Sequence, residues 1–319
     1  MTSRSAKLPA ATAASAPGAV QARESVVRAA NVAHWYELLR AYIALMKPGI
    51  VIELLVIAVP AMVLAASGWP GLDLIALVLV GGVLTGGGAN AINQWYDRDI
   101  DSKMARTMKR PLPMGTIAPR RALAWGLFLS VVGTLQLLLT VNWLSALLAA
   151  SAIAFYVLIY TMWLKRTTVH NTVLGGIAGA APPVVGWAAV TGDLGVAPLL
   201  LFAIVFFWQP PHFWALALRY KDEYAKAGIP MLPVVHGERE THRQSLIYSV
   251  LLLAVSVVLY ATGDVGEIFL GAALVLGVGF VAQAWRLSRG TIVPMSLFFY
   301  SLVYLTVLFA ALALDVAVL

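Results

Sequence analysis

The sequence contains no cysteine and very little charge. None of its 319 residues is Cys, and only 12% are Asp, Glu, Lys or Arg, about half the share in a typical soluble domain. The first absence excludes disulfide bonds, thiolate metal sites and cysteine nucleophiles. The second argues against a soluble fold, because 61% of the residues are hydrophobic and the mean hydropathy is +0.84. The composition therefore predicts an all-α polytopic membrane protein.

Nine hydrophobic segments are each long enough to cross a bilayer, which takes about 20 residues. We expect transmembrane helices at 44–66, 74–96, 120–141, 143–164, 170–191, 196–218, 244–263, 265–286 and 294–315. The break between the third and fourth helices rests on Asn142 alone. Glycines in the second and fifth helices would allow close helix approach, or contact between a ligand and the backbone.

The chain outside these segments is short except at its start. Residues 39–319 are predicted to form a single intramembrane domain. Residues 1–38 are rich in Ala and Ser and are expected to be a disordered cytoplasmic tail; the alternative is an organellar transit peptide.

The positive charges test this segmentation. All 22 Lys and Arg residues lie in the N-terminal segment or in every second connection: 97–121, Lys165–Arg166, 219–243, and Arg286 with Arg289. By the positive-inside rule, the N-terminus and the basic loops are predicted to be cytoplasmic. Orientation in the membrane thus accounts for the net charge of +7 without a nucleic-acid partner.

Chemically active side chains gather where the second predicted helix ends. Asn93, Asp97 and Asp101 are four residues apart, so on a continuous helix they lie on one face. Three such oxygen-bearing side chains suit Mg²⁺, with a phosphate completing its shell. The cations that follow could hold phosphate oxygens: Lys103, Arg106, Lys109 and Arg110. The alternative is a solvated helix end, although carboxylates at the end of a membrane helix are costly and usually functional.

A second polar cluster follows the sixth predicted helix. Asp222 is the candidate for a carboxylate that faces the first cluster, whereas Glu223 would point about 100° away on a helix. Three cations could serve a second phosphate face, and two more form a patch on the same side: Arg219, Lys221 and Lys226, then Lys165 and Arg166. Candidate contacts for a bound acceptor are His212, Tyr220 and Glu53. A hydrogen-bonded core histidine and a neutral carboxylic acid inside the first helix are the alternatives for His212 and Glu53.

Carboxylates and cations at the water-facing mouth of an apolar bundle suit an amphiphilic diphosphate. Mg²⁺ and basic side chains would stabilise the departing pyrophosphate. Cleavage of an allylic C–O bond leaves a carbocation, which the apolar walls would shield from water until an electron-rich acceptor captures it. A transporter of an anionic substrate is an alternative of another class, but its site is expected near the membrane midplane. A haem-binding protein without catalysis would leave the aspartates without a role.

Two motifs resemble those of a known family. The N-x-x-x-D-x-x-x-D pattern at Asn93, Asp97 and Asp101 resembles the first aspartate-rich motif of the UbiA superfamily of intramembrane prenyltransferases. The run HFWALALRYKDEYAKAGIPMLPVVHG, from His212 to Gly237, is similar to the second motif of the branch that farnesylates protohaem IX. The segments WLKR, from Trp163, and NTVLGGIAGA, from Asn171, also resemble that branch. The resemblance covers about residues 43–310.

The resemblance implies nine helices around a central cavity, with a reaction at its cytoplasmic mouth. It implies that Mg²⁺ and diphosphate are held by Asn93, Asp97, Asp101 and Asp222. It also implies that cations surround the pyrophosphate: Lys103, Arg106, Lys109, Arg110, Lys165, Arg166 and Lys221. The farnesyl group of farnesyl diphosphate would join a vinyl group of haem B, with water supplying a new hydroxyl. The alternative acceptor is a quinone-type aromatic ring.

The same resemblance implies partners and a location, and two departures from the family pattern limit it. A haem A synthase or a terminal oxidase assembly factor is the expected protein partner, and the bacterial plasma (inner) membrane the expected site. The sequence has Lys47-Pro48-Gly49 where the family usually has Lys-Pro-Arg, so one expected cation is missing. In the second motif only Asp222 stands, with Glu223 beside it, which leaves open whether one or two metal ions bind.

Overall fold

The computed structural model describes residues 35–318, which fall into two units that divide after Ala41. Of the first unit it describes residues 35–41, which are helical. The predicted tail at 1–38 therefore lies outside the described residues as far as residue 34, and its disorder there stays a prediction. The second unit, from Tyr42 onward, holds the membrane-spanning helices.

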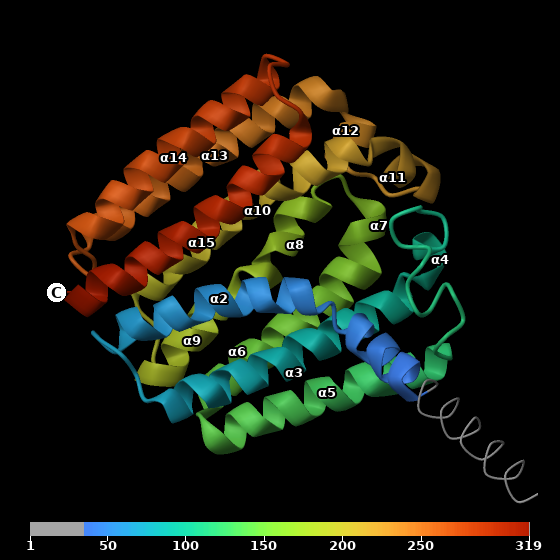
Figure 1. The fold of residues 1–319 in the computed structure, drawn as a ribbon, viewed down its shortest axis with the longest axis horizontal. Coiled ribbons are helices and arrows are strands. Elements are labelled where there is room, and N and C mark those ends of the chain that lie inside the picture. The colour runs from blue at the N-terminus through green and yellow to red at the C-terminus, as the bar shows by residue number, and fades with distance from the viewer. Residues whose placement is uncertain (1–34, 319) are drawn as a thin grey trace, which may run out of the picture. The chain divides into compact units, whose positions relative to one another are not determined.

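Nine helices within residues 35–318 are long and apolar enough to cross a membrane, as the hydropathy predicts. The single-segment spans are α2 (Pro48–Ala65), α3 (Leu72–Tyr96), α5 (Pro119–Thr140), α10 (Val196–Arg219), α13 (Gly237–Ala261), α14 (Glu267–Ser288) and α15 (Pro294–Val318). The two composite spans are α6 (Trp143–Ala154) with η1 (Phe155–Leu164) and α7 (Lys165–Thr167), then α8 (Asn171–Gly179) with α9 (Ala181–Thr191). The chain is a multi-pass membrane protein built of helices (Figure 1).

Two details of these spans differ from a simple hydropathy profile. Helix α13 begins at Gly237, seven residues before the predicted start at 244, because its first turns are polar and lie beyond the apolar segment. In the fourth span, residues Phe155–Leu164 form a π-helix, a rare geometry often found at functional sites. The predicted break at Asn142 is confirmed, since its side chain accepts a hydrogen bond from Ser145 N at 2.8 Å and caps α6.

Glycines let α3 and α5 approach almost to backbone contact, as predicted for the second helix. A Cβ atom built on Gly88 would lie 2.7 Å from the backbone nitrogen of Ser130 and 2.8 Å from the carbonyl oxygen of Gly126. A Cβ on Gly126 would lie 3.0 Å from the carbonyl oxygen of Gly88. Small residues are what close packing of membrane helices requires.

Replacing Gly88 should therefore destabilise the bundle. In Gly88→Ala the methyl group meets backbone atoms of α5 that cannot rotate away, and we expect a cost of about 1–3 kcal/mol. Gly271→Ala in α14 is the matched control, because a Cβ there meets no atom within 4 Å. Thermal unfolding in detergent should show a lower midpoint for Gly88→Ala alone. Equal midpoints would contradict the close α3–α5 contact.

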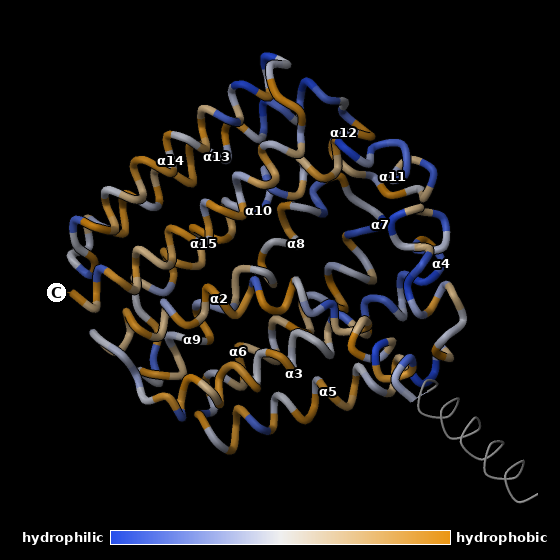
Figure 2. The backbone as a smooth tube through the Cα atoms, viewed as in Figure 1, coloured by the Kyte–Doolittle hydropathy of each residue, from blue (hydrophilic) through white to orange (hydrophobic). Residues whose placement is uncertain are grey.

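The connections that carry the predicted site lie together at one end of the bundle. After α3 the chain forms α4 (Arg98–Asp101), and after α10 it forms α11 (Lys221–Ala227) and α12 (Leu232–Val235). These labels meet at the same end in Figure 1, where Figure 2 shows hydrophilic residues. A buried apolar cluster joins the two connections; its members are Ile100, Met104, Ala217, Ala227, Ile229 and Met231. This packing fixes the first polar cluster against the second.

Candidate functional site

Asn93, Asp97 and Asp101 lie together and are buried, although no single helix runs through them. Helix α3 ends at Tyr96 and α4 begins at Arg98, with Asp97 between them. The i to i+4 backbone pattern nevertheless continues: Asp97 N donates to Asn93 O at 2.9 Å and Asp101 N donates to Asp97 O at 2.8 Å. The exposed fractions of the three residues are 2%, 0% and 4%. The three side chains therefore stay on one face, as predicted, because the i to i+4 hydrogen bonds continue through the short break between α3 and α4.

The two carboxylates of this cluster, those of Asp97 and Asp101, are each paired with a cation. Lys165 Nζ donates to Asp97 Oδ2, and Arg166 lies 3.5 Å from Asp97 Oδ1. Arg110 donates to both oxygens of Asp101, at 2.9 and 2.7 Å. Because burying an unpaired carboxylate is very costly, these cations offset the cost of burying Asp97 and Asp101. The structure thus brings together three of the predicted cations and both aspartates.

Lys47 is a site residue that sequence reasoning did not place in the site. It stands before Pro48 at the start of α2, in a left-handed backbone conformation with φ 51°, and its Nζ donates to Asn93 Oδ1 at 2.7 Å. Burial, together with the neighbouring Arg110 and Lys165 cations, lowers the pKa of Lys47 to about 7. The Lys-Pro pair where an apolar run begins was the available signal.

The π-helix supports the amide of Asn93 from another side. Asn93 Nδ2 donates to Asp97 Oδ2 at 2.9 Å and to Thr161 Oγ1 at 3.0 Å. Thr161 lies in η1, whose last residue precedes Lys165. The same irregular segment therefore orients Asn93 and delivers Lys165 to Asp97.

The second cluster meets the first through Glu223 and Tyr224. Glu223 Oε2 accepts from the backbone nitrogen of Arg106, and Tyr224 Oη accepts from the Arg106 guanidinium, both at 3.4 Å. Asp222 is exposed and, within residues 35–318, makes no hydrogen bond to the first cluster. Asp222 was expected to face that cluster and Glu223 to point away, whereas in the structure the contact is made by Glu223.

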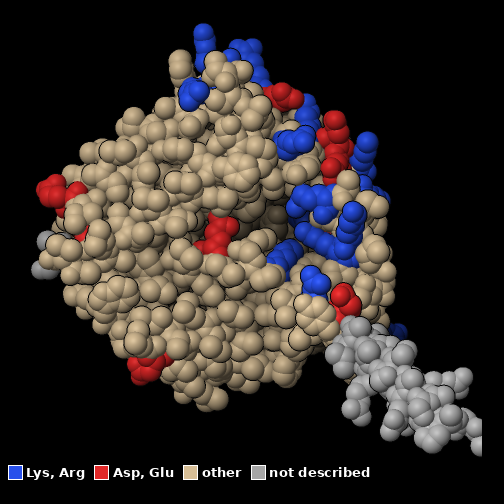
Figure 3. All heavy atoms as spheres, in the orientation of Figure 1, with Lys and Arg blue, Asp and Glu red and all other residues tan. Residues whose placement is uncertain are grey.

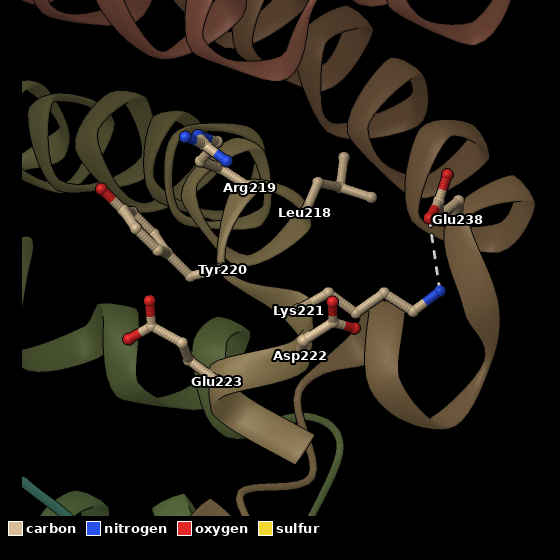
Figure 4. Close-up of a pocket in the computed structure, with 7 residues that line it drawn as sticks. All are labelled: Leu218, Arg219, Tyr220, Lys221, Asp222, Glu223 and Glu238. Atoms are coloured by element: carbon tan, nitrogen blue, oxygen red, sulfur yellow. Dashed lines mark hydrogen bonds and ion pairs between the residues drawn. The ribbon is translucent and has the colours of Figure 1, made fainter. Parts of the chain in front are cut away.

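Asp222 instead borders a cavity of about 440 Å³ beside the second cluster. Figure 4 shows Asp222 and Glu223 directed to different sides, and Lys221 paired with Glu238 at 3.3 Å. The cavity is lined by Leu218, Arg219, Tyr220, Lys221, Asp222, Glu223 and Glu238. Because both positively and negatively charged side chains line the cavity, it suits a polar ligand or ordered water better than an apolar chain.

The remaining predicted residues divide into surface cations and buried groups. Lys103 and Lys109 are exposed, with no ion pair to an aspartate in the described part of the chain. The Tyr220 ring lies under two guanidinium groups, those of Arg106 at 5.6 Å and Arg219 at 5.7 Å from the ring centroid. Figure 3 shows Lys and Arg gathered at this end of the helices, around the rim of a hollow.

His212, predicted as a candidate acceptor contact, is enclosed. Its ring stacks between Trp208 and Phe298, with centroids 4.4 and 4.5 Å away, and its Nδ1 lies 2.7 Å from Ser301 Oγ. The residue is only 5% exposed. This geometry matches the alternative of a hydrogen-bonded core histidine. Glu53, by contrast, has a carboxyl oxygen that is buried and accepts no hydrogen bond.

The oxygen donors fit a metal that a substrate helps to hold. Within residues 35–318 no group of three His, Cys, Asp or Glu side chains is placed to hold a metal ion by itself. Mg²⁺, however, is usually bound by one or two carboxylates with substrate phosphates and water. Asp97 and Asp101 supply two carboxylates, Asn93 an amide oxygen, and the paired cations are available to a phosphate.

Comparison with protein families shows the family to which the chain belongs. The model of the UbiA prenyltransferase family matches residues 54–302, which include the aspartate cluster, the π-helix and the second cluster. The chain belongs to the UbiA prenyltransferase family. It is 52% identical, over 88% of its length and 95% of the relative's, to a protein of Symbiobacterium thermophilum named protoheme IX farnesyltransferase. A Frankia alni protein of the same name is 50% identical, over 88% of this chain and 99% of its own.

Solved structures show the same fold at low identity. A structure described as digeranylgeranylglyceryl phosphate synthase matches 89% of this chain and all of its own with a TM-score of 0.74, at 17% identity. A UbiA homologue from Archaeoglobus fulgidus, bound to GPP and Mg²⁺, matches 88% of this chain and all of its own with a TM-score of 0.64, at 18% identity. The UbiA fold predicted from the motifs is therefore confirmed.

Proposed function

We propose that the protein transfers the farnesyl group of farnesyl diphosphate to a vinyl group of haem B, giving haem O and diphosphate. The observation that carries this proposal is the pair of relatives named protoheme IX farnesyltransferase, which are about half identical over nearly their entire length. The family membership supports prenyl transfer. The buried aspartates and their cations support a diphosphate donor.

In this proposal the donor binds at the first cluster. Asn93, Asp97 and Asp101 hold Mg²⁺, with Asp222 as a further candidate ligand, and the Archaeoglobus fulgidus homologue with GPP and Mg²⁺ supports this use of the fold. When bound, Mg²⁺ supplies positive charge that offsets the charge of the departing diphosphate. The chain adds cations that now pair with carboxylates and can turn to phosphate oxygens: Arg110, Lys165 and Arg166.

The apolar bundle performs the rest of the proposed chemistry. Its walls take the farnesyl chain and keep water from the allylic carbon while the C–O bond breaks. Haem B enters from the membrane side, and the new C–C bond forms at one vinyl group. We place the reaction in the bacterial plasma membrane, and a haem A synthase or an oxidase assembly factor would receive the product.

Acceptor choice tests this function. Purified protein is incubated with farnesyl diphosphate, Mg²⁺ and either haem B or a quinone-type aromatic acid, and the products are identified by mass. We expect a farnesylated haem and no farnesylated aromatic acid. A farnesylated aromatic acid without farnesylated haem would show that the acceptor is an aromatic ring, and it would leave the proposed donor site unchanged.

Arg110→Ala should weaken donor binding. The guanidinium is held at Asp101 within hydrogen-bond distance of both oxygens, and losing a charged hydrogen bond to the diphosphate would cost about 1.5–3 kcal/mol, or at least about tenfold in apparent KM. Lys109→Ala should have a smaller effect, because Lys109 is exposed. Arg120→Ala, an exposed cation in the first turn of α5, is the control. An unchanged KM in Arg110→Ala would remove this residue from the site.

A further inference from the structure

Thr161 is a polar side chain inside the fourth span to which the proposed reaction gives no role. It lies in the π-helix η1 and has no exposed surface. Its Oγ1 accepts a hydrogen bond from Asn93 Nδ2 at 3.0 Å, although the two residues are 68 positions apart in the sequence. Thr161 therefore contacts a candidate metal ligand from a distant segment of the chain.

This contact is one of two that join the end of α3 to the fourth span. Asn93 and Asp97 are four residues apart, and each meets a residue of that span. Their partners, Thr161 and Lys165, are also four residues apart, so both contacts have the same offset of 68 residues. The equal offset shows that the two segments run in the same direction with these side chains matched. Thr161 is thus held opposite Asn93 as Lys165 is held opposite Asp97.

The hydrogen bonds of Asn93 set the direction in which its amide points. Its nitrogen donates to Asp97 Oδ2 at 2.9 Å and to Thr161 Oγ1, and these bonds use both of its N–H groups. Its oxygen, Oδ1, accepts from the Lys47 ammonium at 2.7 Å. The opposite orientation would place the amide nitrogen against the ammonium, and both groups only donate. The amide oxygen therefore faces a positive charge, as the oxygen of a metal ligand must.

The two acceptors of the amide nitrogen differ in what else they bind. Asp97 Oδ2 also accepts from Lys165, and Asp97 is itself a proposed Mg²⁺ ligand. An ammonium, an amide and the metal would therefore share its carboxylate. The hydroxyl of Thr161 is neutral, and the proposed site does not use it to hold the metal. Thr161 can hold the amide in one orientation both before and after the metal binds.

We infer that Thr161 is a positioning residue for the metal site. Through its hydrogen bond to Asn93 Nδ2 it keeps Asn93 Oδ1 oriented for Mg²⁺, and it thereby sets the affinity for the metal. The inference rests on the proposed function, in which Asn93 is a Mg²⁺ ligand. Residues that hold metal ligands in place affect metal affinity or activity by about 10–100-fold. A contact that only joined two helices would affect stability alone.

The test measures metal affinity and stability separately, in detergent-solubilised protein. Thr161→Val and Thr161→Ala both remove the acceptor, whereas Thr161→Ser keeps the hydroxyl. Mg²⁺ binding in the presence of inorganic diphosphate is measured by calorimetry, and folding is followed by thermal unfolding without ligand. Thr241→Val is the matched control, because Thr241 also has no exposed surface and its hydroxyl donates to Gly237 O within α13.

We expect the Kd for Mg²⁺ to rise by about 10–100-fold in Thr161→Val and Thr161→Ala. Thr161→Ser and Thr241→Val should keep Kd near the wild-type value. Asn93→Ala should also weaken Mg²⁺ binding. Adding Thr161→Val to Asn93→Ala should raise Kd no further, because Thr161 acts on the metal only through Asn93.

Two results would overturn the inference and leave the metal site in place. One is a wild-type Kd in the Thr161 variants that lack the hydroxyl, whatever their thermal midpoints. The other is a further rise in Kd when Thr161→Val is added to Asn93→Ala, since Thr161 would then act by another route. Wild-type protein that binds no Mg²⁺ with diphosphate, or binds it equally well after Asn93→Ala, would instead overturn the proposed metal site, and the inference with it.

Discussion

Asp97→Asn is expected to reduce prenyl transfer by at least about 100-fold, the scale seen when a charge-stabilising group is removed from an active site. The carboxylate is fully buried, with Lys165 and Arg166 beside it. Asparagine keeps the shape but removes the negative charge that a divalent cation requires. Asp101→Asn should act in the same way, because Asp101 is 4% exposed and also ion-paired. Product formation under saturating donor is the measurement.

A binding measurement separates loss of metal from loss of structure. Inorganic diphosphate without Mg²⁺ should bind Asp97→Asn at least as tightly as wild type, because two cations lose a competing carboxylate. Asp99→Asn is the neighbouring control: the Asp99 side chain is 54% exposed and contacts Arg166. Its activity should fall only slightly. Full activity in Asp97→Asn, or an equal loss in Asp99→Asn, would contradict the metal assignment.

Lys165→Met is expected to destabilise the ligand-free protein and to abolish turnover. The ammonium pairs with Asp97, which has no exposed surface. Removing one partner of a buried pair costs about 3–5 kcal/mol, and the lower end applies because Arg166 remains 3.5 Å from the other oxygen. A lower thermal unfolding midpoint and a strongly reduced kcat should appear together.

Two further measurements test whether the lower stability and the lower kcat of Lys165→Met come from the loss of the Lys165 positive charge. Mg²⁺ with inorganic diphosphate should raise the midpoint of Lys165→Met more than that of wild type, because the metal replaces the missing cation. The double variant Lys165→Met/Asp97→Asn should regain stability, since both charges are removed, but no activity. A double variant as unstable as the sum of the two single variants would show that the pair is not coupled.

The membrane helices could be predicted from the sequence because hydropathy depends only on composition along the chain. Even the weakest boundary, at Asn142, proved correct, since an amide side chain before an apolar run is a typical helix cap. The start of α13 at Gly237 was missed because helical turns outside the membrane carry no apolar signal. The π-helix from Phe155 to Leu164 was missed because its residues are as apolar as those of an ordinary span.

The site was predictable where its residues are neighbours in sequence. The i, i+4 spacing of Asn93, Asp97 and Asp101 suffices to place them together, and backbone hydrogen bonds retain it through a helical break. Contacts between segments that are distant in the sequence were harder to predict. Whether Asp222 or Glu223 meets the first cluster depends on how α11 packs, and Lys47 reaches Asn93 through a left-handed turn that spacing does not reveal.

The central claim is that this aspartate cluster binds Mg²⁺ and a prenyl diphosphate for transfer to haem. The most direct measurement incubates detergent-solubilised protein with haem B, farnesyl diphosphate and Mg²⁺, with and without a chelator, and searches by mass for hydroxyethylfarnesyl haem. We predict that this product forms with Mg²⁺ and disappears when the chelator is present. Folded protein that gives neither haem product nor pyrophosphate, or a product that is indifferent to the chelator, would contradict the account.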